Sequence, residues 1–228
     1  MGSGDCEAVE TRFQFHGYAG EDGCCEARDA RGQALIAADL RQVLAAVPCF
    51  TSETLVATGQ GLCAVGSLTP GARVITRDSG LQELRWIGRK RFGWRGLGLN
   101  PLLRPVRIAA GALGGGVPER DMVVSPNHRF LTRLPGEGES GERLAMARDL
   151  IGLEGVSSDT RSEVDYWQLL FARHELVLAD GSWSESFQPT ASSLAAIGVG
   201  SLSDLREVLP AEEDFAAVRP FAEVNPAA

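Results

Sequence analysis

One cysteine and two histidines stand where nucleophilic chemistry could occur. Cys49 directly follows Pro48 and precedes a segment of alternating apolar residues. His128 ends the turn Ser-Pro-Asn-His between two apolar segments, and His174 opens a third one. A thiolate is a strong nucleophile and an unperturbed imidazole titrates near neutrality, so this set could attack a carbonyl and move the protons that the reaction needs. A free thiol has a pKa of about 8.5, so we expect Cys49 to need only modest activation.

Each of these residues also has a structural explanation. A single cysteine is usually a small, inert apolar residue, and a single histidine is usually a hydrogen-bonded core residue. Asp180, which precedes Gly181, is typical of a turn between two strands. The argument for chemistry therefore depends on whether the fold brings these residues together.

The elements that must position these side chains are short strands. From residue 54 onward the apolar residues alternate with a period of two, and glycine and proline separate the alternating segments, as is typical of strands and turns. We expect strands over residues 54–58, 72–76, 84–88, 105–110, 122–125, 129–132, 166–172 and 174–180. The dipeptide Asp180-Gly181 after the last of them predicts a hairpin turn.

Both ends of the chain differ from this β-rich centre. Residues 11–16 predict one strand, whereas residues 34–46 have apolar positions at helical spacing that end before Pro48. After Pro189 the composition is helical, and we expect one or two short helices that could cover an open sheet edge. The predicted organisation is an N-terminal extension with a short helix (1–47), a β domain (48–190) and a helical tail (191–228).

Composition and charge exclude several classes of protein. The chain has 228 residues, of which 44% are hydrophobic, and no apolar run reaches the roughly 18–20 residues of a membrane-spanning helix. The net charge of −8 argues against a nucleic-acid binder. We interpret the basic segment from Leu84 to Pro118 as a solvated strand-and-turn face with arginine side chains over aromatic rings. The first residues lack a secretion signal, so we expect a cytoplasmic location or export without a leader.

Metal and cofactor binding are not predicted. The five cysteines have no zinc-ligand spacing and no CxxC pair, and the three histidines are scattered along the chain. We therefore expect a protein that works without a metal ion or a cofactor.

Four segments in a fixed order resemble the hedgehog/intein (Hint) domain family, and most of all its bacterial autoprocessing modules. They are CFTSETLVAT (49–58), LTPGARVITRDSG (68–80), DMVVSPNHRFLTR (121–133) and HELVLADGSWSESF (174–187). The resemblance implies an all-β Hint fold, disc-like or horseshoe-shaped, with two halves related by pseudo-two-fold symmetry. It also implies that Cys49, the turn with His128 and the strand that His174 opens lie close together.

The activity that the resemblance implies is single-turnover self-cleavage. In this family the first cysteine of the domain attacks the carbonyl before it. Here Cys49 would attack Pro48, and an N–S acyl shift would turn the Pro48–Cys49 peptide into a thioester. His128 would supply a proton to the departing amine, and the Ser125 hydroxyl would hydrogen-bond the same peptide group. The chain's own N-terminal segment is the acyl donor, and the acyl acceptor is not identified by the sequence.

The second step differs from splicing. His174 and Asp180 lie in the strand where family members place groups for this step. Splicing inteins end in His-Asn, but no asparagine lies between Ser182 and Gln188, and Ser186 stands where hedgehog proteins have a cysteine. We therefore expect cleavage by water or an external nucleophile without full splicing. A prolyl carbonyl is hindered, so we expect the reaction to be slow.

Two other functions fit the same residues. The first is a Cys–His hydrolase that acts on other molecules, with Cys49 as nucleophile and His128 or His174 as base. The second is a non-catalytic binding or structural module in which the thiol is buried and inert.

Overall fold

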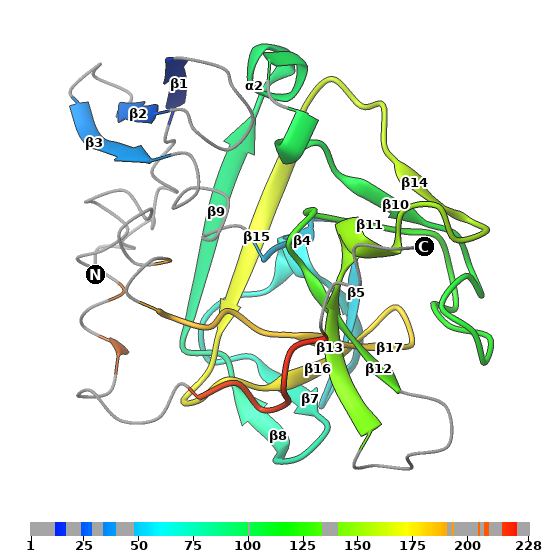
Figure 1. Cartoon of the computed structure of the whole chain (residues 1–228). Coiled ribbons are helices and arrows are strands. Elements are labelled where there is room, and N and C mark those ends of the chain that lie inside the picture. Colours follow the sequence, from blue (N-terminus) through cyan, green and yellow to red (C-terminus); the bar gives the residue numbers. More distant parts are fainter. Residues whose placement is uncertain are drawn as a thin grey trace.

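The described part of the protein is built mainly from short strands. The computed structural model describes residues 12–16, 24–28, 34–39, 48–99, 101–133 and 141–190, residues 216–222, and positions 193, 205, 208 and 209. In these residues the strands pair antiparallel in three sheets (Figure 1). The predicted all-β class is confirmed for the described residues.

Two large sheets form the main body. The six-stranded sheet has the order β14-β10-β11-β4-β15-β9, and its strands are Val156–Ser158, Val106–Ile108, Met122–Val124, Phe50–Thr51, Val164–Leu170 and Trp86–Phe92. The eight-stranded sheet has the order β13-β12-β17-β16-β5-β7-β8, with β6 paired to β5. Its strands, in that order and ending with β6, are Glu142–Met146, Arg129–Arg133, Ser182–Glu185, Leu176–Ala179, Leu55–Thr58, Arg73–Thr76, Gly80–Glu83 and Gly61–Ala64.

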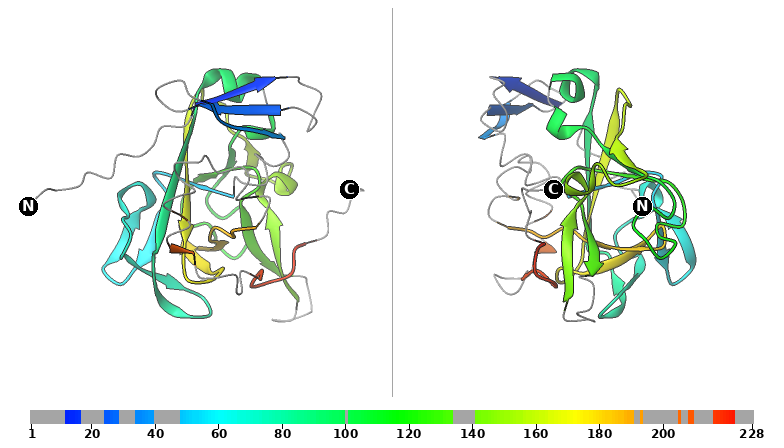
Figure 2. Two further views of the ribbon diagram at one scale, coloured as in Figure 1. Left: turned by 90° about the vertical axis from the view of Figure 1, so that its left-hand side faces the viewer. Right: turned by 45° about the vertical axis from the view of Figure 1, so that its right-hand side comes forward.

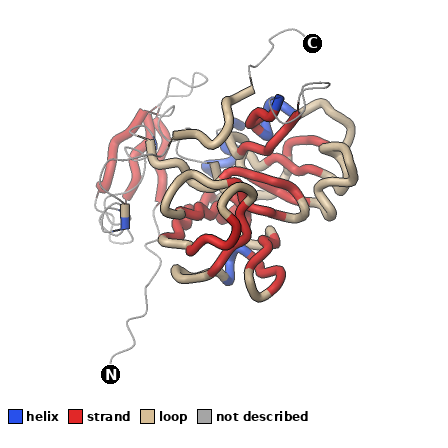
Figure 3. Tube along the Cα trace, turned by 90° about the horizontal axis from the view of Figure 1, so that it is seen from below, coloured by secondary structure: helices blue, strands red, loops and turns tan. Residues whose placement is uncertain are grey.

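A small sheet and a few short helices complete the described elements. The strands of the small sheet pair in sequence order and are β1 (Arg12–His16), β2 (Cys24–Arg28) and β3 (Ala34–Asp39). This sheet lies to one side of the main body, with β1 near β9 (Figures 1 and 3). The helices are α2 (Trp94–Leu99) and the 3-10 turns Val65–Ser67, Pro101–Leu103 and Ala147–Leu150. Among the described residues, no helix has the length and apolar character needed to cross a membrane.

The long strands β9 and β15 run side by side along the main body (Figures 1 and 2). Along β9, Trp86 is buried, whereas Arg89 and Arg91 lie on the other face and both bind Asp165 of β15, with N–O distances of 2.8–3.2 Å. Arg89 also lies over the Trp167 ring, 5.3 Å from its centroid. Over β9 the two arginines therefore lie on one strand face, with one of them over an aromatic ring as predicted, whereas Lys90 is buried on the other face and not solvated.

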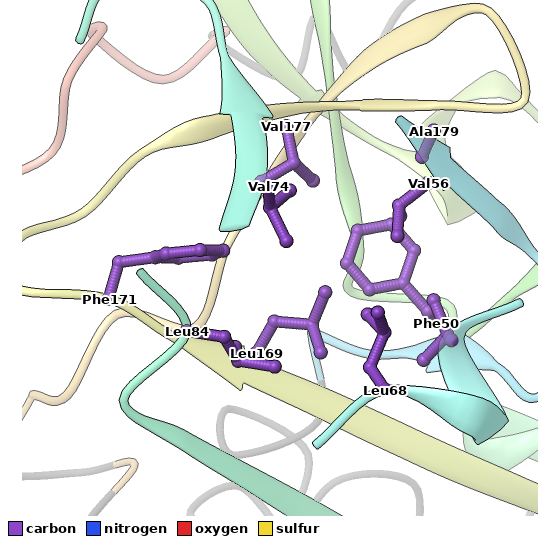
Figure 4. Packing of buried hydrophobic residues seen from close by; sticks show 10 residues of the cluster. Phe50, Val56, Leu68, Val74, Leu84, Leu169, Phe171, Val177 and Ala179 are labelled. Carbon is purple, nitrogen blue, oxygen red and sulfur yellow. The ribbon is translucent and has the colours of Figure 1, made fainter. Parts of the chain in front are cut away.

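An apolar core joins the two large sheets (Figure 4). Phe50 and Leu169 come from the six-stranded sheet, and Val56, Val74 and Val177 come from the eight-stranded sheet. All five side chains are at most 2% exposed, and full burial of such a side chain contributes roughly 1.5–3 kcal/mol. Because Phe50 is one of them, the core also fixes the chain at its neighbour Cys49.

The eight strands predicted from residue 54 onward are all present, as β5, β7, β9, β10, β11, β12, β15 and β16. The strand predicted over residues 11–16 is β1. The hairpin between β16 and β17 turns at Asp180-Gly181, as predicted, with φ angles of 44° and 79°. The left-handed region that both residues occupy is one that Asp and Gly tolerate best.

The helix predicted over residues 34–46 is wrong for its first half. Ala34–Asp39 is β3, which pairs antiparallel with β2 so that Asp39 lies opposite Cys24. Residues 40–46 lie outside the described residues. Five apolar residues in a row (34–38) fit a short helix as well as a strand, and pairing with a neighbouring strand decides between them.

The predicted helical tail lies largely outside the described residues. Ser193, Leu205 and Val208 have helical backbone, but no C-terminal helix is seen in the part of the chain that the structure describes. Residues 216–222 instead run along the edge strand β13. Leu144 of β13 donates its N–H to the Pro220 carbonyl at 2.9 Å and accepts from Ala222 at 3.0 Å. At this edge the described contact is made by extended chain and not by a helix as predicted.

Candidate active site

Cys49 packs beside the six-stranded sheet. It immediately precedes β4, which sits in the middle of the six-stranded sheet because Phe50 pairs with both Val124 of β11 and Trp167 of β15. Its side chain is 0% exposed and lies in an apolar cluster with Phe92, Leu97, Leu103, Val164 and Tyr166. Pro48 is buried as well. The peptide that joins Pro48 to Cys49 is therefore held inside the protein.

Ser125 hydrogen-bonds this peptide directly. The backbone N–H of Cys49 donates to Ser125 Oγ at 2.8 Å, and the backbone N–H of Ser125 donates to the Cys49 carbonyl at 3.0 Å. Both residues are fully buried. The nitrogen that would leave in an acyl shift thus contacts the hydroxyl that the sequence predicted at this place.

His128 belongs to the same turn. Its N–H donates to the Ser125 carbonyl at 3.1 Å, and its own carbonyl accepts from Ala147 at 2.8 Å, so the backbone of the turn is fixed at both ends. The ring lies between Phe50 and Phe130, with centroid distances of 4.4 Å and 5.2 Å. Among the described residues neither ring nitrogen has a hydrogen-bond partner. The imidazole is therefore held by packing, with both nitrogens available.

Burial moves the two titrating groups in opposite directions. It raises the pKa of the Cys49 thiol to about 12, which the Lys90 charge partly opposes and the Glu185 charge reinforces. It lowers the pKa of His128 to about 4, with Glu185 opposing the change and Arg129 adding to it. The expectations of modest thiol activation and of an imidazole that titrates near neutrality are both wrong for this resting site. At neutral pH the thiol and the imidazole are both uncharged.

The sequence analysis missed Glu185. It ends β17, is 0% exposed, and accepts from Arg129 Nη1 on both carboxylate oxygens at 3.0 and 3.2 Å. The backbone N–H of Arg129 donates to the same carboxylate at 3.1 Å. Burial acts to raise the pKa of Glu185, but His174 and the Arg129 charge hold it below its ordinary value. In the sequence the signal is its place beside Ser186 in the Ser-Glu-Ser-Phe segment, at the end of the last predicted hairpin.

His174 lies beside Glu185. Its Nε2 is 3.6 Å from Glu185 Oε2, and its Nδ1 accepts the backbone N–H of Val218 at 3.3 Å. Ser186 takes a structural place, because its hydroxyl accepts from the Glu175 N–H at 2.9 Å. The structure thus joins His174 to the His128 turn by way of Glu185 and Arg129.

Asp180 lies at the other end of the β16–β17 hairpin. Its Oδ1 accepts the Leu55 N–H at 3.1 Å, and Arg120 Nε is 3.4 Å away. Burial raises the pKa of this carboxyl. Because Glu185 pairs with Leu176 at the far end of the hairpin, about 13 Å of strand separates Asp180 from Glu185. The structure does not bring Asp180 to the Cys49 end of the site.

A polar pocket lies next to β4. It has a volume of about 240 Å³ and is lined by Thr51, Ser52, Glu53, Arg91, Arg161, Glu163, Val164 and Asp165. Two ion pairs line it, Arg161 with Glu53 and Arg91 with Asp165, each at 3.0 Å. In the part of the chain that the structure describes, no three His, Cys, Asp or Glu side chains gather as a metal ion would require.

Comparison with known families gives one match that covers more than half of the chain. The family model described as "Hint domain" matches residues 48–191. No curated protein sequence matches the chain.

Several solved structures are similar to the chain at low identity. The gp41-1 intein is 13% identical over 60% of this chain and 96% of its own, with a TM-score of 0.37. A DnaB intein from Synechocystis is 13% identical over 61% and 98%, with a TM-score of 0.35. An intein-like domain from Clostridium thermocellum is 15% identical over 61% and 98%, with a TM-score of 0.37. At these scores the family match, and not the structural likeness, carries the assignment.

Proposed function

Because the chain belongs to the Hint domain family, we propose that it cleaves itself once, at the Pro48–Cys49 peptide, without splicing. Cys49 Sγ attacks the Pro48 carbonyl carbon, the new C–S bond forms, and the C–N bond to Cys49 breaks. The thiol gives up its proton and the departing nitrogen gains one, so the product is a thioester with a free α-amine on Cys49. We also propose that the β domain consists of two halves related by pseudo-two-fold symmetry, as the family resemblance implies.

The observation that carries this proposal is the bond between the Cys49 N–H and Ser125 Oγ, 2.8 Å long in a fully buried site. A buried hydroxyl at the scissile nitrogen can accept its N–H in the resting peptide and donate to its lone pair once the nitrogen becomes tetrahedral. The bond in the resting peptide holds the hydroxyl in place, and the proposed gain comes from its donation to the tetrahedral nitrogen, which the planar amide cannot accept. Differential stabilisation of this kind is what lowers a barrier.

The pKa directions determine when protons move. With a thiol pKa of about 12 and an imidazole pKa of about 4, a separated thiolate–imidazolium pair is strongly disfavoured before attack. Proton transfer then accompanies C–S bond formation instead of preceding it. In this proposal His128 takes the thiol proton as the bond forms and returns it toward the amine, with Ser125 at the nitrogen.

The second step is proposed to be transfer to water or to an external nucleophile. Water on the thioester would give residues 1–48 a carboxyl end at Pro48 and restore the Cys49 thiol. The segment from Ser182 to Gln188 contains no asparagine that could cyclise, which supports cleavage without ligation. We propose that His174, next to Glu185, belongs to this step.

The two alternatives are affected differently by the burial of Cys49. A hydrolase that acts on other molecules needs a thiol that a substrate can reach, and a side chain that is 0% exposed opposes this function. Self-cleavage has no such need, because the attacked carbonyl is in the same chain. A non-catalytic module is favoured by one observation, the thiol pKa of about 12, and is the second candidate.

The experiment is incubation of the purified chain with and without dithiothreitol, followed by intact mass measurement. We expect a thiol-dependent fragment that begins at Cys49, and we expect none from Cys49→Ala. Cys63→Ala is the matched control, because Cys63 is a second free, half-buried thiol in β6. A parent chain that stays intact, or a Cys49→Ala variant that cleaves like the parent, leaves the non-catalytic module as the function.

A further inference from the structure

Glu185 holds the backbone that carries the imidazole. Its carboxylate accepts the backbone N–H of Arg129 at 3.1 Å, and Arg129 directly follows His128. The Arg129 guanidinium donates hydrogen bonds to both oxygens of the same carboxylate. The last strand of the domain, β17, is thus fixed to the turn that links the two large sheets. The proposed reaction leaves this carboxylate without a role.

The charge of Glu185 also acts on both groups that exchange the proton. A nearby carboxylate disfavours a thiolate and favours an imidazolium. In agreement, Glu185 raises the pKa of Cys49 and opposes the burial that lowers the pKa of His128. The Glu185 charge therefore lowers the free energy of the protonated His128 ring, which forms when the thiol gives up its proton.

The C-terminal segment 216–222 contacts both partners of Glu185. The Val218 N–H donates to His174 Nδ1, so the neutral ring carries its proton on Nε2, on the side that lies 3.6 Å from the carboxylate. The Phe221 ring lies 4.3 Å from the Arg129 guanidinium carbon. This extended segment therefore fixes the tautomer of one partner and the position of the other.

We propose that Glu185 is a positioning residue of the acyl shift: it holds the His128 turn against the Cys49 peptide and stabilises the proton on the His128 ring, while residues 216–222 orient its two partners. The inference rests on the proposed self-cleavage and adds a residue to it. Among the described residues the carboxylate makes its hydrogen bonds to Arg129 and none to the scissile peptide or the thiol, so it acts through His128 and Arg129.

The test compares three variants of the full chain: Glu185→Gln, Glu185→Asp and the control Asp165→Asn. Asp165 is a matched control because it also binds two arginines, on β9, and those arginines lower its pKa in the same way. One readout is the rate at which the Cys49 fragment appears. The other is the pH midpoint of the His128 ring, followed by NMR, which does not depend on cleavage.

We expect Glu185→Gln to cleave about tenfold more slowly and its His128 midpoint to move about one unit to lower pH, since one unit corresponds to a tenfold change. Glu185→Asp keeps the charge but withdraws it from the backbone, so both of its values lie between those of the parent and Glu185→Gln. Asp165→Asn matches the parent in both. A merely structural carboxylate would not move the His128 midpoint.

Parent-like rate and midpoint in Glu185→Gln overturn the inference. If that variant does not fold, Glu185→Asp decides, and parent-like values there overturn it equally. If the parent chain never cleaves, the proposed function fails by itself. The His128 midpoint still decides for or against Glu185 in that case.

Discussion

The β16–β17 hairpin holds a buried acid at each end, and the two acids are bound in different ways. At the turn, Asp180 accepts a backbone N–H from Leu55, and its own N–H donates to the Leu55 carbonyl at 2.8 Å. At the open end, Glu185 is bound by the side chain of Arg129 and lies beside His174. One acid joins two strands, and the other lies among titrating groups.

This difference appears in the charges. Burial acts to raise the pKa of both acids, and it prevails at Asp180, whereas His174 and Arg129 hold Glu185 ionised. An acid whose partners are mostly backbone groups fixes a turn. An ionised acid among histidines biases where a proton resides. Substitutions at the Cys49 end should therefore change the reaction, and substitutions at the turn should change stability.

The largest effect is expected for His128→Gln. Glutamine fills a similar volume between Phe50 and Phe130 but cannot take up a proton at neutral pH. Loss of a general acid–base group typically costs about 10²–10⁴-fold in rate. The rate of fragment formation, with circular dichroism to check the fold, measures this. A variant that cleaves at the parent rate would remove His128 from the reaction.

Ser125→Ala is expected to follow. It removes the hydroxyl that lies 2.8 Å from the Cys49 nitrogen and that would donate to this nitrogen in the transition state. Loss of a bond of about 1–3 kcal/mol corresponds to a rate roughly five- to 150-fold lower. Ser125→Thr keeps the hydroxyl and should restore most of the rate. Equal rates for the alanine and threonine variants would reduce Ser125 to a structural role.

The third effect is on stability in acid. Burial lowers the pKa of His128 in the folded protein to about 4, from its ordinary 6.5, so on acidification the unfolded chain takes up this proton first. From about pH 7 to about pH 5 the parent should lose about 2 kcal/mol through this group alone. His128→Gln should lose that much less over the same range in denaturant titrations. Glu185 has a lowered pKa and acts only at lower pH, so it does not mask the difference.

The smallest effect on the reaction is expected at the turn. Asp180→Ala removes the acceptor of the Leu55 N–H and places alanine at a φ of 44°, which should cost about 1–2 kcal/mol of unfolding free energy. Asp180→Asn tolerates this φ and keeps an acceptor oxygen, so it serves as the control. Thermal unfolding should separate the two, and both should cleave like the parent. A slower reaction in either would return Asp180 to the second step.

Much of the fold follows from the short apolar segments that turn residues separate, since Val56, Val74 and Val177 lie in three of them and all three are buried in the core. The pattern could not reveal β4, because two residues carry no period, although β4 sets the position of Cys49. It also assigned residues 34–39 to a helix, because a short apolar run fits both structures until a partner strand is known.

The candidate site was predictable in part. Cys49, Ser125 and His128 were selected by their order along the chain, and the structure joins Ser125 to both. Glu185 was missed, because a glutamate between two serines looks like a solvated residue until burial and its contact with Arg129 are known. The pKa directions were missed for the same reason, since burial is a property of the folded core and not of local sequence.

Capture of the thioester at Pro48 tests the central claim most directly. Hydroxylamine attacks thioesters and leaves ordinary amides intact, so the purified chain is incubated with it and the products are identified by mass and by sequencing the new N-terminus. The account predicts residues 1–48 with a hydroxamate on Pro48 and a second fragment that begins at Cys49, and neither product from Cys49→Ala. An intact parent chain, a new N-terminus at another residue, or the same two products from Cys49→Ala would contradict it.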